Sequence, residues 1–218
     1  MFQEDSVNAI TEQQPGTATA PRRGRTPALG ESEARLAALE AATRLYYARG
    51  IQSVGMDALA AESGIGLKRL YQLFPSKDAI VEQVLGGLHA SWDRDVAAAV
   101  DALDEPRDQL LAIYDYLDAW FAKDNFRGCA FINSFGELGA SSPAVATSVR
   151  EHKQGFQDFV ADIAERAGAP RSLGRQLAIL AEGAQTTAAI AGESSAAKLA
   201  RDAADVLITA SLGPSDRP

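Results

Sequence analysis

Five polar side chains between residues 68 and 77 have the types that contact nucleic acid. They are Lys68, Arg69, Tyr71, Gln72 and Lys77. An arginine can donate two hydrogen bonds to the O6 and N7 atoms of guanine, whereas lysine and a tyrosine hydroxyl reach phosphate oxygens. When such residues open a short helix, they are typical of a recognition helix that enters the major groove of DNA.

Two short segments with apolar periodicity form the frame for these residues. We expect a helix over about residues 56–63, a turn at Gly64 and a second helix over about residues 67–73. Glycine adopts the positive φ that a tight turn needs. This order predicts a helix-turn-helix. An earlier helix, capped by Ser32 and ended by Gly50, would complete a three-helix head.

The charge changes along the 218-residue chain, whose net charge is −8. Residues 21–80 carry nine Lys or Arg against six Asp or Glu, whereas residues 81–218 carry twelve against twenty. A basic segment joined to an acidic body indicates a DNA-binding unit on a core that does not bind DNA. An uneven surface without this function would give the same pattern.

Residues 1–30 have no apolar periodicity, and we expect them to be disordered. Arg22, Arg23 and Arg25 form a basic arm within them. Such an arm can enter a narrow, A·T-rich minor groove, where the negative potential is strongest. The alternative is a solvated basic linker.

The remaining sequence is rich in alanine and leucine and predicts about nine helices without a strand, an all-α fold. We expect a head over residues 31–80, a helical-bundle domain for ligand binding and dimerisation over residues 81–213, and a tail over residues 214–218. No apolar run is long enough to span a membrane. The single cysteine, Cys129, fits a reducing cytoplasm.

The head contains the motif M-D-A-L-A-A-E-S-G-I-G from residue 56 and the motif L-Y-Q-L-F-P-S-K-D-A-I from residue 70. With these two motifs it resembles the TetR family of transcriptional regulators. The resemblance implies that Lys68 and Arg69 read base edges, that Tyr71 and Lys77 contact phosphates, and that Gln72 does either. Gly66 stands where the family usually has serine, so its backbone N–H would replace a capping hydroxyl.

The resemblance also implies a homodimer, formed by the last two helices at about residues 173–212, on duplex DNA with a (pseudo)palindromic operator. A small molecule bound in the larger domain would tilt the long fourth helix and release a repressor. Activation uses the same head and stays open.

A ligand site needs aromatic walls and few polar anchors. Aromatic residues are concentrated in residues 81–170, where several polar residues also interrupt apolar runs. Our candidate ligand-binding residues are Trp92, Tyr114, Leu117, Phe121, Cys129, Ile132, Asn133, Glu137, His152 and Phe156. The alternative is plain core packing with satisfied polar contacts.

Other classes of function have weaker support. Arg127 and a helix start could activate Cys129 as a thiol sensor, although a lone cysteine in an apolar run is commonly core. A helical-bundle enzyme using Cys129 with His152, and an architectural DNA-binding protein without an effector, are the rival functions. His89 and His152 have no companion at metal-binding spacing, and no catalytic motif occurs. We therefore expect no metal, no cofactor and no catalysis.

Overall fold

The computed structural model describes residues 29–212, which form nine α-helices and no strand. The predicted arm with Arg22, Arg23 and Arg25 and the predicted tail over residues 214–218 lie outside the described residues. None of the helices within residues 29–212 is long and apolar enough to cross a membrane. The helices are α1 (Glu31–Arg49), α2 (Met56–Ser63), α3 (Leu67–Leu73), α4 (Lys77–Asp101), α5 (Pro106–Phe121), α6 (Ala130–Leu138), α7 (Pro143–Arg166), α8 (Arg171–Ala191) and α9 (Ala196–Leu212).

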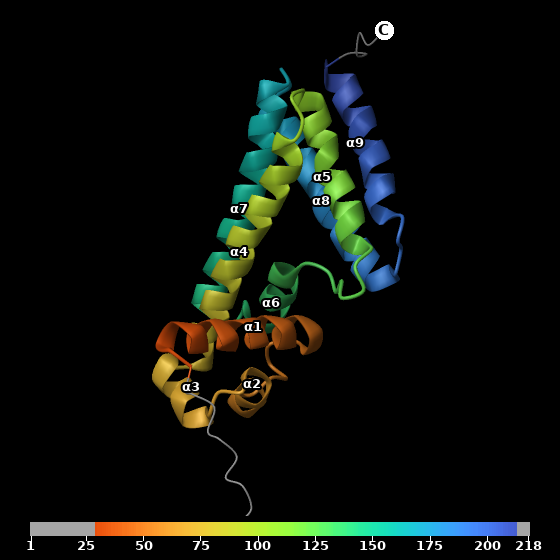
Figure 1. The fold of residues 1–218 in the computed structure, drawn as a ribbon. Coiled ribbons are helices and arrows are strands. Elements are labelled where there is room, and N and C mark those ends of the chain that lie inside the picture. Colours follow the sequence, from red (N-terminus) through yellow and green to blue (C-terminus); the bar gives the residue numbers. More distant parts are fainter. Residues whose placement is uncertain (1–28, 213–218) are drawn as a thin grey trace, which may run out of the picture.

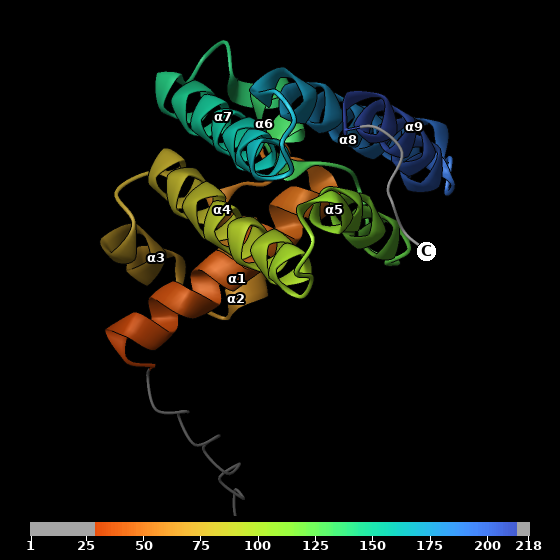
Figure 2. The same cartoon turned by 90° about the horizontal axis from the view of Figure 1, so that it is seen from above.

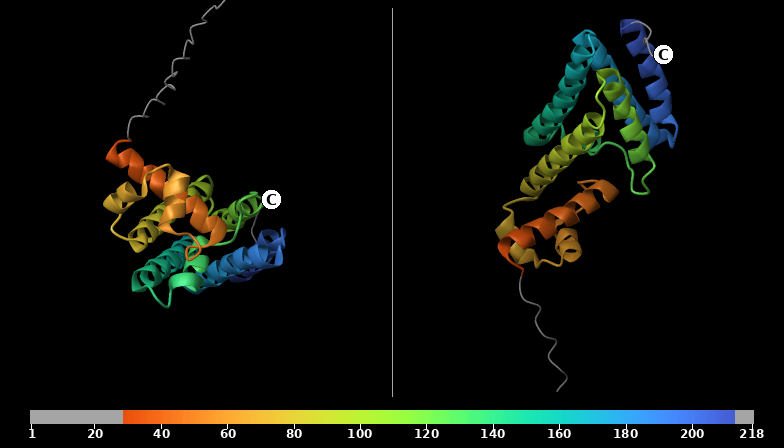
Figure 3. Two further views of the ribbon diagram at one scale, coloured as in Figure 1. Left: turned by 90° about the horizontal axis from the view of Figure 1, so that it is seen from below. Right: turned by 45° about the horizontal axis from the view of Figure 1, so that its top comes forward.

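We call α1–α3 the head and α5–α9 the body; α4 connects them (Figure 1). Seen from above, α7, α8 and α9 form one row and face a second row made of α4 and α5 (Figure 2). The head lies across one end of this bundle, with α1 between the bundle and the pair α2 and α3 (Figure 3). The long helix α4 therefore reaches from the recognition helix to the far end of the body.

The apolar side chains form two cores that share α4. One core joins the head to the first half of α4, to α6 and to the start of α7, around residues such as Leu59, Leu70 and Phe74. The other core joins the second half of α4 to α5, α7, α8 and α9, around residues such as Leu117 and Ile163. Burial of this apolar surface is the main force holding the elements together.

The ends of the head helices follow the local chemistry of the sequence. Gly64 ends α2 with φ 70°, which confirms the predicted turn. Ser76 caps α4, because its Oγ accepts a hydrogen bond of 3.1 Å from the N–H of Ala79. The prediction for Ser32 was wrong: α1 begins at Glu31 after Gly30, and the Glu33 carboxylate accepts the Gly30 N–H at 2.9 Å. That contact is the half of a capping box in which the N3 carboxylate accepts the N–H of the N-cap residue.

Two glycines permit close approaches that position the site. Gly50 ends α1 with φ 83°, and a Cβ there would lie 3.0 Å from Oε1 of Glu137. Gly174 lets α8 pack tightly on α7, since a Cβ there would lie 2.3 Å from the Cα of Ala161. Either substitution would push apart elements that surround the cavity described next.

Candidate functional site

The recognition helix α3 presents polar side chains to solvent. Leu70 and Leu73 are buried and anchor the helix to the head core. Lys68, Tyr71 and Gln72 are exposed, and Tyr71 keeps 52% of its surface accessible. The N-terminus of α3 follows Gly66, which makes no side-chain cap, so its free N–H groups are available to an anion.

Two of the predicted DNA contacts are held by the protein itself. The guanidinium of Arg69 is partly buried and donates to the carbonyl oxygens of Leu29 and Gly30, so it holds the start of α1. The ammonium of Lys77 donates to the carbonyl oxygen of Ile51 and ties the start of α4 to the turn after α1. Arg69 must release its carbonyl partners before it can place two hydrogen bonds on a base.

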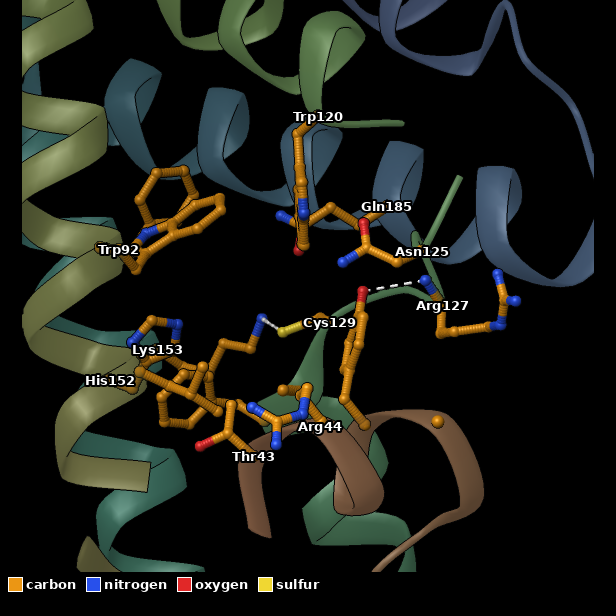
Figure 4. Close-up of a pocket in the computed structure, with 16 residues that line it drawn as sticks. Thr43, Arg44, Trp92, Trp120, Asn125, Arg127, Cys129, His152, Lys153 and Gln185 are labelled. Atoms are coloured by element: carbon orange, nitrogen blue, oxygen red, sulfur yellow. Dashed lines mark hydrogen bonds between the residues drawn. The ribbon is translucent and has the colours of Figure 1, made fainter. Parts of the chain in front are cut away.

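A cavity of about 510 Å³ lies where α1 meets the body. Figure 4 shows its side chains converging from the head and from the body. Its lining residues are Thr43, Arg44, Tyr47, Ala48, Leu88, Trp92, Trp120, Asn125, Arg127, Cys129, Ala130, Phe131, His152, Lys153, Phe156 and Gln185. This volume is within the range of small-molecule sites in proteins.

The cavity walls are aromatic. The indole rings of Trp92 and Trp120 meet edge to face, with their centroids 5.3 Å apart, and Phe156 lies 6.0 Å from Trp92 in the same manner. Such rings give a large apolar contact area and geometrically defined contacts. The cavity therefore favours a ligand with a substantial apolar part.

The charged groups in the lining are all cationic: Arg44, Arg127 and Lys153. Arg44 pairs with Glu62 at 3.2 Å, and Lys153 pairs with Glu182 at 3.4 Å, both partners being outside the lining. These ion pairs reduce the positive potential of the cavity, but the three side chains supply only N–H donors, which favour electron-rich groups of a ligand.

Gln185 is the clearest polar anchor in the cavity. Only 2% of its surface is accessible, yet its amide makes no hydrogen bond to any residue in the described part of the chain. Its amide can both donate and accept hydrogen bonds within the cavity that it lines. A polar ligand group, or water, would supply the missing partner.

His152 is also buried, with 4% of its surface accessible, and its ring stacks on Phe131 at a centroid distance of 3.6 Å. Burial, with the positive charge of Lys153 and the neighbouring His89, lowers the pKa of His152 to about 3. The imidazole is therefore neutral at neutral pH.

Four of the ten predicted ligand-binding residues line this cavity: Trp92, Cys129, His152 and Phe156. The six that lie elsewhere have structural partners. Tyr114 is buried in the body, where burial raises its pKa and its hydroxyl donates to the carbonyl of Leu177 at 2.8 Å. Leu117 is core, Phe121 packs against Trp120, and Ile132 packs against the head core.

Asn133 and Glu137 also lie outside the lining of this cavity, and their side chains bond to backbone groups. The Asn133 amide donates to the Arg127 carbonyl at 3.1 Å. The Glu137 carboxylate accepts the N–H groups of Ile51 at 3.0 Å and Gln52 at 2.8 Å, and the Gln52 amide donates to the Glu137 carbonyl at 2.6 Å. Glu137 therefore clamps the turn after α1 onto α6.

Several cavity residues were absent from the sequence-based candidates, notably Arg44, Tyr47, Trp120, Lys153 and Gln185. Tyr47 has a second role. Its hydroxyl accepts the Arg127 N–H at 2.8 Å and donates to the Gly128 carbonyl at 2.9 Å. Tyr47 thus links α1 to the segment before α6, and Glu137 links α6 to the turn after α1.

The chemistry expected of Cys129 has little support in its contacts. Its Sγ lies 3.7 Å from Nζ of Lys153. Within the described residues, no hydrogen bond joins this sulfur to His152, whose Nδ1 faces His89 instead. The Arg127 guanidinium donates instead to the carbonyls of Asp124 and Phe126. A thiol–imidazole pair of the kind that activates a nucleophile is therefore missing at these two residues.

A second surface lies on α8 and α9. Large apolar side chains there are accessible: Ile179 at 65%, Ile190 at 83%, Leu199 at 61% and Val206 at 68%. Contiguous exposed apolar surface marks sites of protein association.

Comparisons with known proteins agree with this architecture. Residues 38–84 match the model of the bacterial regulatory proteins of the tetR family. SCO4454, a TetR-family transcriptional regulator from Streptomyces coelicolor, is 28% identical, with a TM-score of 0.77 over 83% of this chain and 97% of its own. A putative TetR transcriptional regulator from Streptomyces avermitilis is 29% identical, with a TM-score of 0.67 over 79% of this chain and 98% of its own.

A putative transcriptional regulator from Saccharomonospora viridis, solved in complex with choline, shares the fold at 20% identity, with a TM-score of 0.66 over 81% of this chain and 96% of its own. No curated protein matches the sequence. The matched head, with its helix-turn-helix, and the fold shared along nearly the full length of these regulators lead to one conclusion. The head matches the tetR family of bacterial regulatory proteins, and the fold as a whole is that of TetR-family transcriptional regulators.

Proposed function

We propose that the protein is a homodimeric repressor in the cytoplasm that leaves its operator when a small molecule fills the body cavity. The observation that carries this proposal is the position of the cavity, which is lined by α1 of the head and by helices of the body. A ligand there contacts the helix on which α2 and α3 pack. Binding energy that differs between two positions of α1 can therefore change the affinity for DNA.

The DNA contacts that we propose are on α3 and the start of α4. Lys68 and Arg69 would read base edges, while Tyr71, Lys77 and the Gly66 N–H would bind phosphates, with Gln72 contacting either. Arg22, Arg23 and Arg25 would add minor-groove contacts.

The proposed dimer interface is the exposed apolar face of α8 and α9. A two-fold axis at this face would place two copies of α3 in successive major grooves, and the operator would be (pseudo)palindromic. Light scattering of the full chain tests this arrangement. Ile190→Glu should give monomers, whereas the matched change at an exposed apolar residue elsewhere, Leu103→Glu, should leave dimers. Monomeric wild-type protein would contradict the proposal.

The effector should combine an aromatic or aliphatic part with a carboxylate or another electron-rich group. Trp92, Trp120 and Phe156 would hold the apolar part, and Lys153 and Gln185 would hold the polar part. Choline is the ligand of the Saccharomonospora viridis regulator. The cationic lining of this cavity disfavours a quaternary ammonium ion and favours an anion.

The experiment compares aromatic and aliphatic carboxylates with their uncharged amides, by thermal shift and by release of bound operator DNA. We expect carboxylates to raise Tm and to release the DNA, and we expect Gln185→Leu to weaken both effects. If no compound raises Tm or releases the DNA, an effector-free architectural protein is favoured, whereas turnover of a compound would favour an enzyme. A reporter gene then distinguishes repression from activation.

A further inference from the structure

Two histidines and an aspartate meet where α4 packs on α7. His89 and Asp93 are one turn apart on α4, and His152 faces them from α7. Nδ1 of His89 lies 3.1 Å from Nδ1 of His152 and 3.4 Å from Oδ1 of Asp93. One ligand atom from each residue fits within 4.8 Å of the others. These are the two histidines of the whole sequence.

We propose that His89, Asp93 and His152 bind a divalent transition-metal ion, best represented by Zn²⁺, with a fourth position left for water or another ligand. Zinc binds imidazole nitrogen and carboxylate oxygen at roughly 2.0–2.2 Å, and tetrahedral angles then place neighbouring ligand atoms roughly 3.3 Å apart. The two separations measured from Nδ1 of His89 have this size. Three protein ligands with one open position are typical of zinc sites that exchange their fourth ligand.

The three proposed metal ligands range from exposed to buried. The Asp93 side chain is 57% exposed and the His89 side chain is 42% exposed, whereas His152 is buried. Stacking on Phe131 holds the His152 ring in a fixed plane, and imidazole nitrogen is a common ligand of zinc. A metal ion therefore has both an entry route and a rigid inner ligand.

The surrounding charges are compatible with a cation. His89 and Asp93 line a groove of about 300 Å³ together with Glu151, which adds a second carboxylate nearby. Lys153 is the nearby opposing charge, and its ion pair with Glu182 reduces its effect. Imidazole with one carboxylate suits zinc, cobalt and nickel better than magnesium or calcium, which prefer oxygen ligands alone.

A bound ion would connect α4 to α7 by coordination bonds. Because α4 also reaches the head, the ion would fix the connecting helix against the body. Binding to the folded chain alone should then raise the thermal stability in proportion to the affinity.

The test uses untagged, chelator-treated, full-length protein and Co²⁺, whose visible d–d bands are strong in tetrahedral sites. We expect one Co²⁺ per chain, strong bands that Zn²⁺ abolishes, and an increase in Tm. Asp93→Asn and His152→Gln should each weaken binding by more than about 100-fold, since even outer residues of metal sites change affinity by 10–100-fold.

Asp95→Asn is the matched control, because it removes the same charge from an exposed position on the same helix. Asp93 is exposed, so Asp93→Asn should fold even if His152→Gln does not. Equal affinity in wild type, Asp93→Asn and Asp95→Asn would overturn the proposal, as would a weak octahedral spectrum. The two histidines would then form only a hydrogen-bonded pair through their Nδ1 atoms. No DNA is involved, so the outcome is independent of the proposed regulatory function.

Discussion

The recognition helix and the cavity beside α1 place their polar groups in opposite environments. Lys68, Tyr71 and Gln72 of α3 face solvent on one short helix, where water satisfies them until a partner binds. The cavity encloses polar groups within aromatic walls, and one of them, Gln185, has no partner among the described residues. A surface of the first kind suits a large polyanion, whereas the second suits a small molecule that replaces buried water.

Besides α4 and the shared apolar core, two groups of hydrogen bonds join the head to the segments around the cavity. Glu137 clamps the turn after α1, and Tyr47 bonds to the backbone beside the cavity. If ligand binding in the cavity changes the affinity for DNA, removing these hydrogen bonds should weaken that coupling. The predictions below follow this idea, beginning with the largest expected effect.

Glu137→Ala should remove the clamp between head and body. The carboxylate accepts two backbone N–H groups, and hydrogen bonds to charged groups contribute about 1.5–3 kcal/mol each. Because the bond to Gln52 is exposed to solvent and contributes less, we expect a loss of about 2–4 kcal/mol of unfolding free energy. Urea denaturation measures this loss, with Glu151→Ala on exposed α7 as the control. An equal change in both variants would show that the clamp contributes nothing.

His152 should make the stability depend on pH. Its pKa is about 3 in the folded chain, against 6.5 as the ordinary value, so between these values the unfolded chain binds the extra proton. Stability is complete above pH 6.5 and falls as the pH falls. We expect wild type to lose about 2–3 kcal/mol more than His152→Asn between pH 6.5 and pH 4.5, at about 1.4 kcal/mol per pH unit. Denaturation in chelator across this range measures it, and parallel curves would contradict it.

Arg69→Ala tests whether α3 reads the bases of DNA. If Arg69 exchanges its carbonyl partners for a guanine, the variant loses about 1–3 kcal/mol of binding free energy and relaxes specificity at one base position. Lys77→Ala should instead weaken all sequences alike and flatten the dependence on salt. Binding titrations on matched and mutated operators measure both effects. Wild-type affinity in both variants would show that the proposed docking is wrong.

Tyr47→Phe should have the smallest effect. The change keeps the ring but removes two hydrogen bonds to the segment before α6, at about 0.5–1.5 kcal/mol each. We expect a stability loss of about 1–2 kcal/mol and a weaker coupling between cavity ligand and DNA. Operator titrations with and without the ligand measure the coupling, and unchanged coupling would leave Tyr47 with a packing role alone.

The head could be predicted because its signals are local. Gly64, Ser76 and the apolar spacing of α2 and α3 determine their turns and caps within a few residues. The cavity could not be predicted in the same way, because α1, α4, α5, α6, α7 and α8 each contribute to it. Periodicity identified Trp92 and Phe156 as inward-facing, but no local pattern distinguished them from Tyr114 in the core.

Polar residues were the hardest to assign. Glu137 follows an apolar run, which suggested a ligand anchor, but its partners are backbone groups 85 and 86 residues earlier in the chain. His89 and His152 are 63 residues apart, so their contact had no signal in the spacing. Such pairings depend on how α4 and α7 pack, which only the folded chain shows.

The most direct test of the account is selection of duplex DNA from a random library by the full-length protein. We predict an enriched inverted repeat whose half-sites are separated by about one helical turn, roughly 10 base pairs, or a multiple of it. We also predict that Arg69→Ala loses the preference at one position of each half-site. Enrichment of no sequence, or of a single half-site without symmetry, would contradict a dimer that reads DNA through α3.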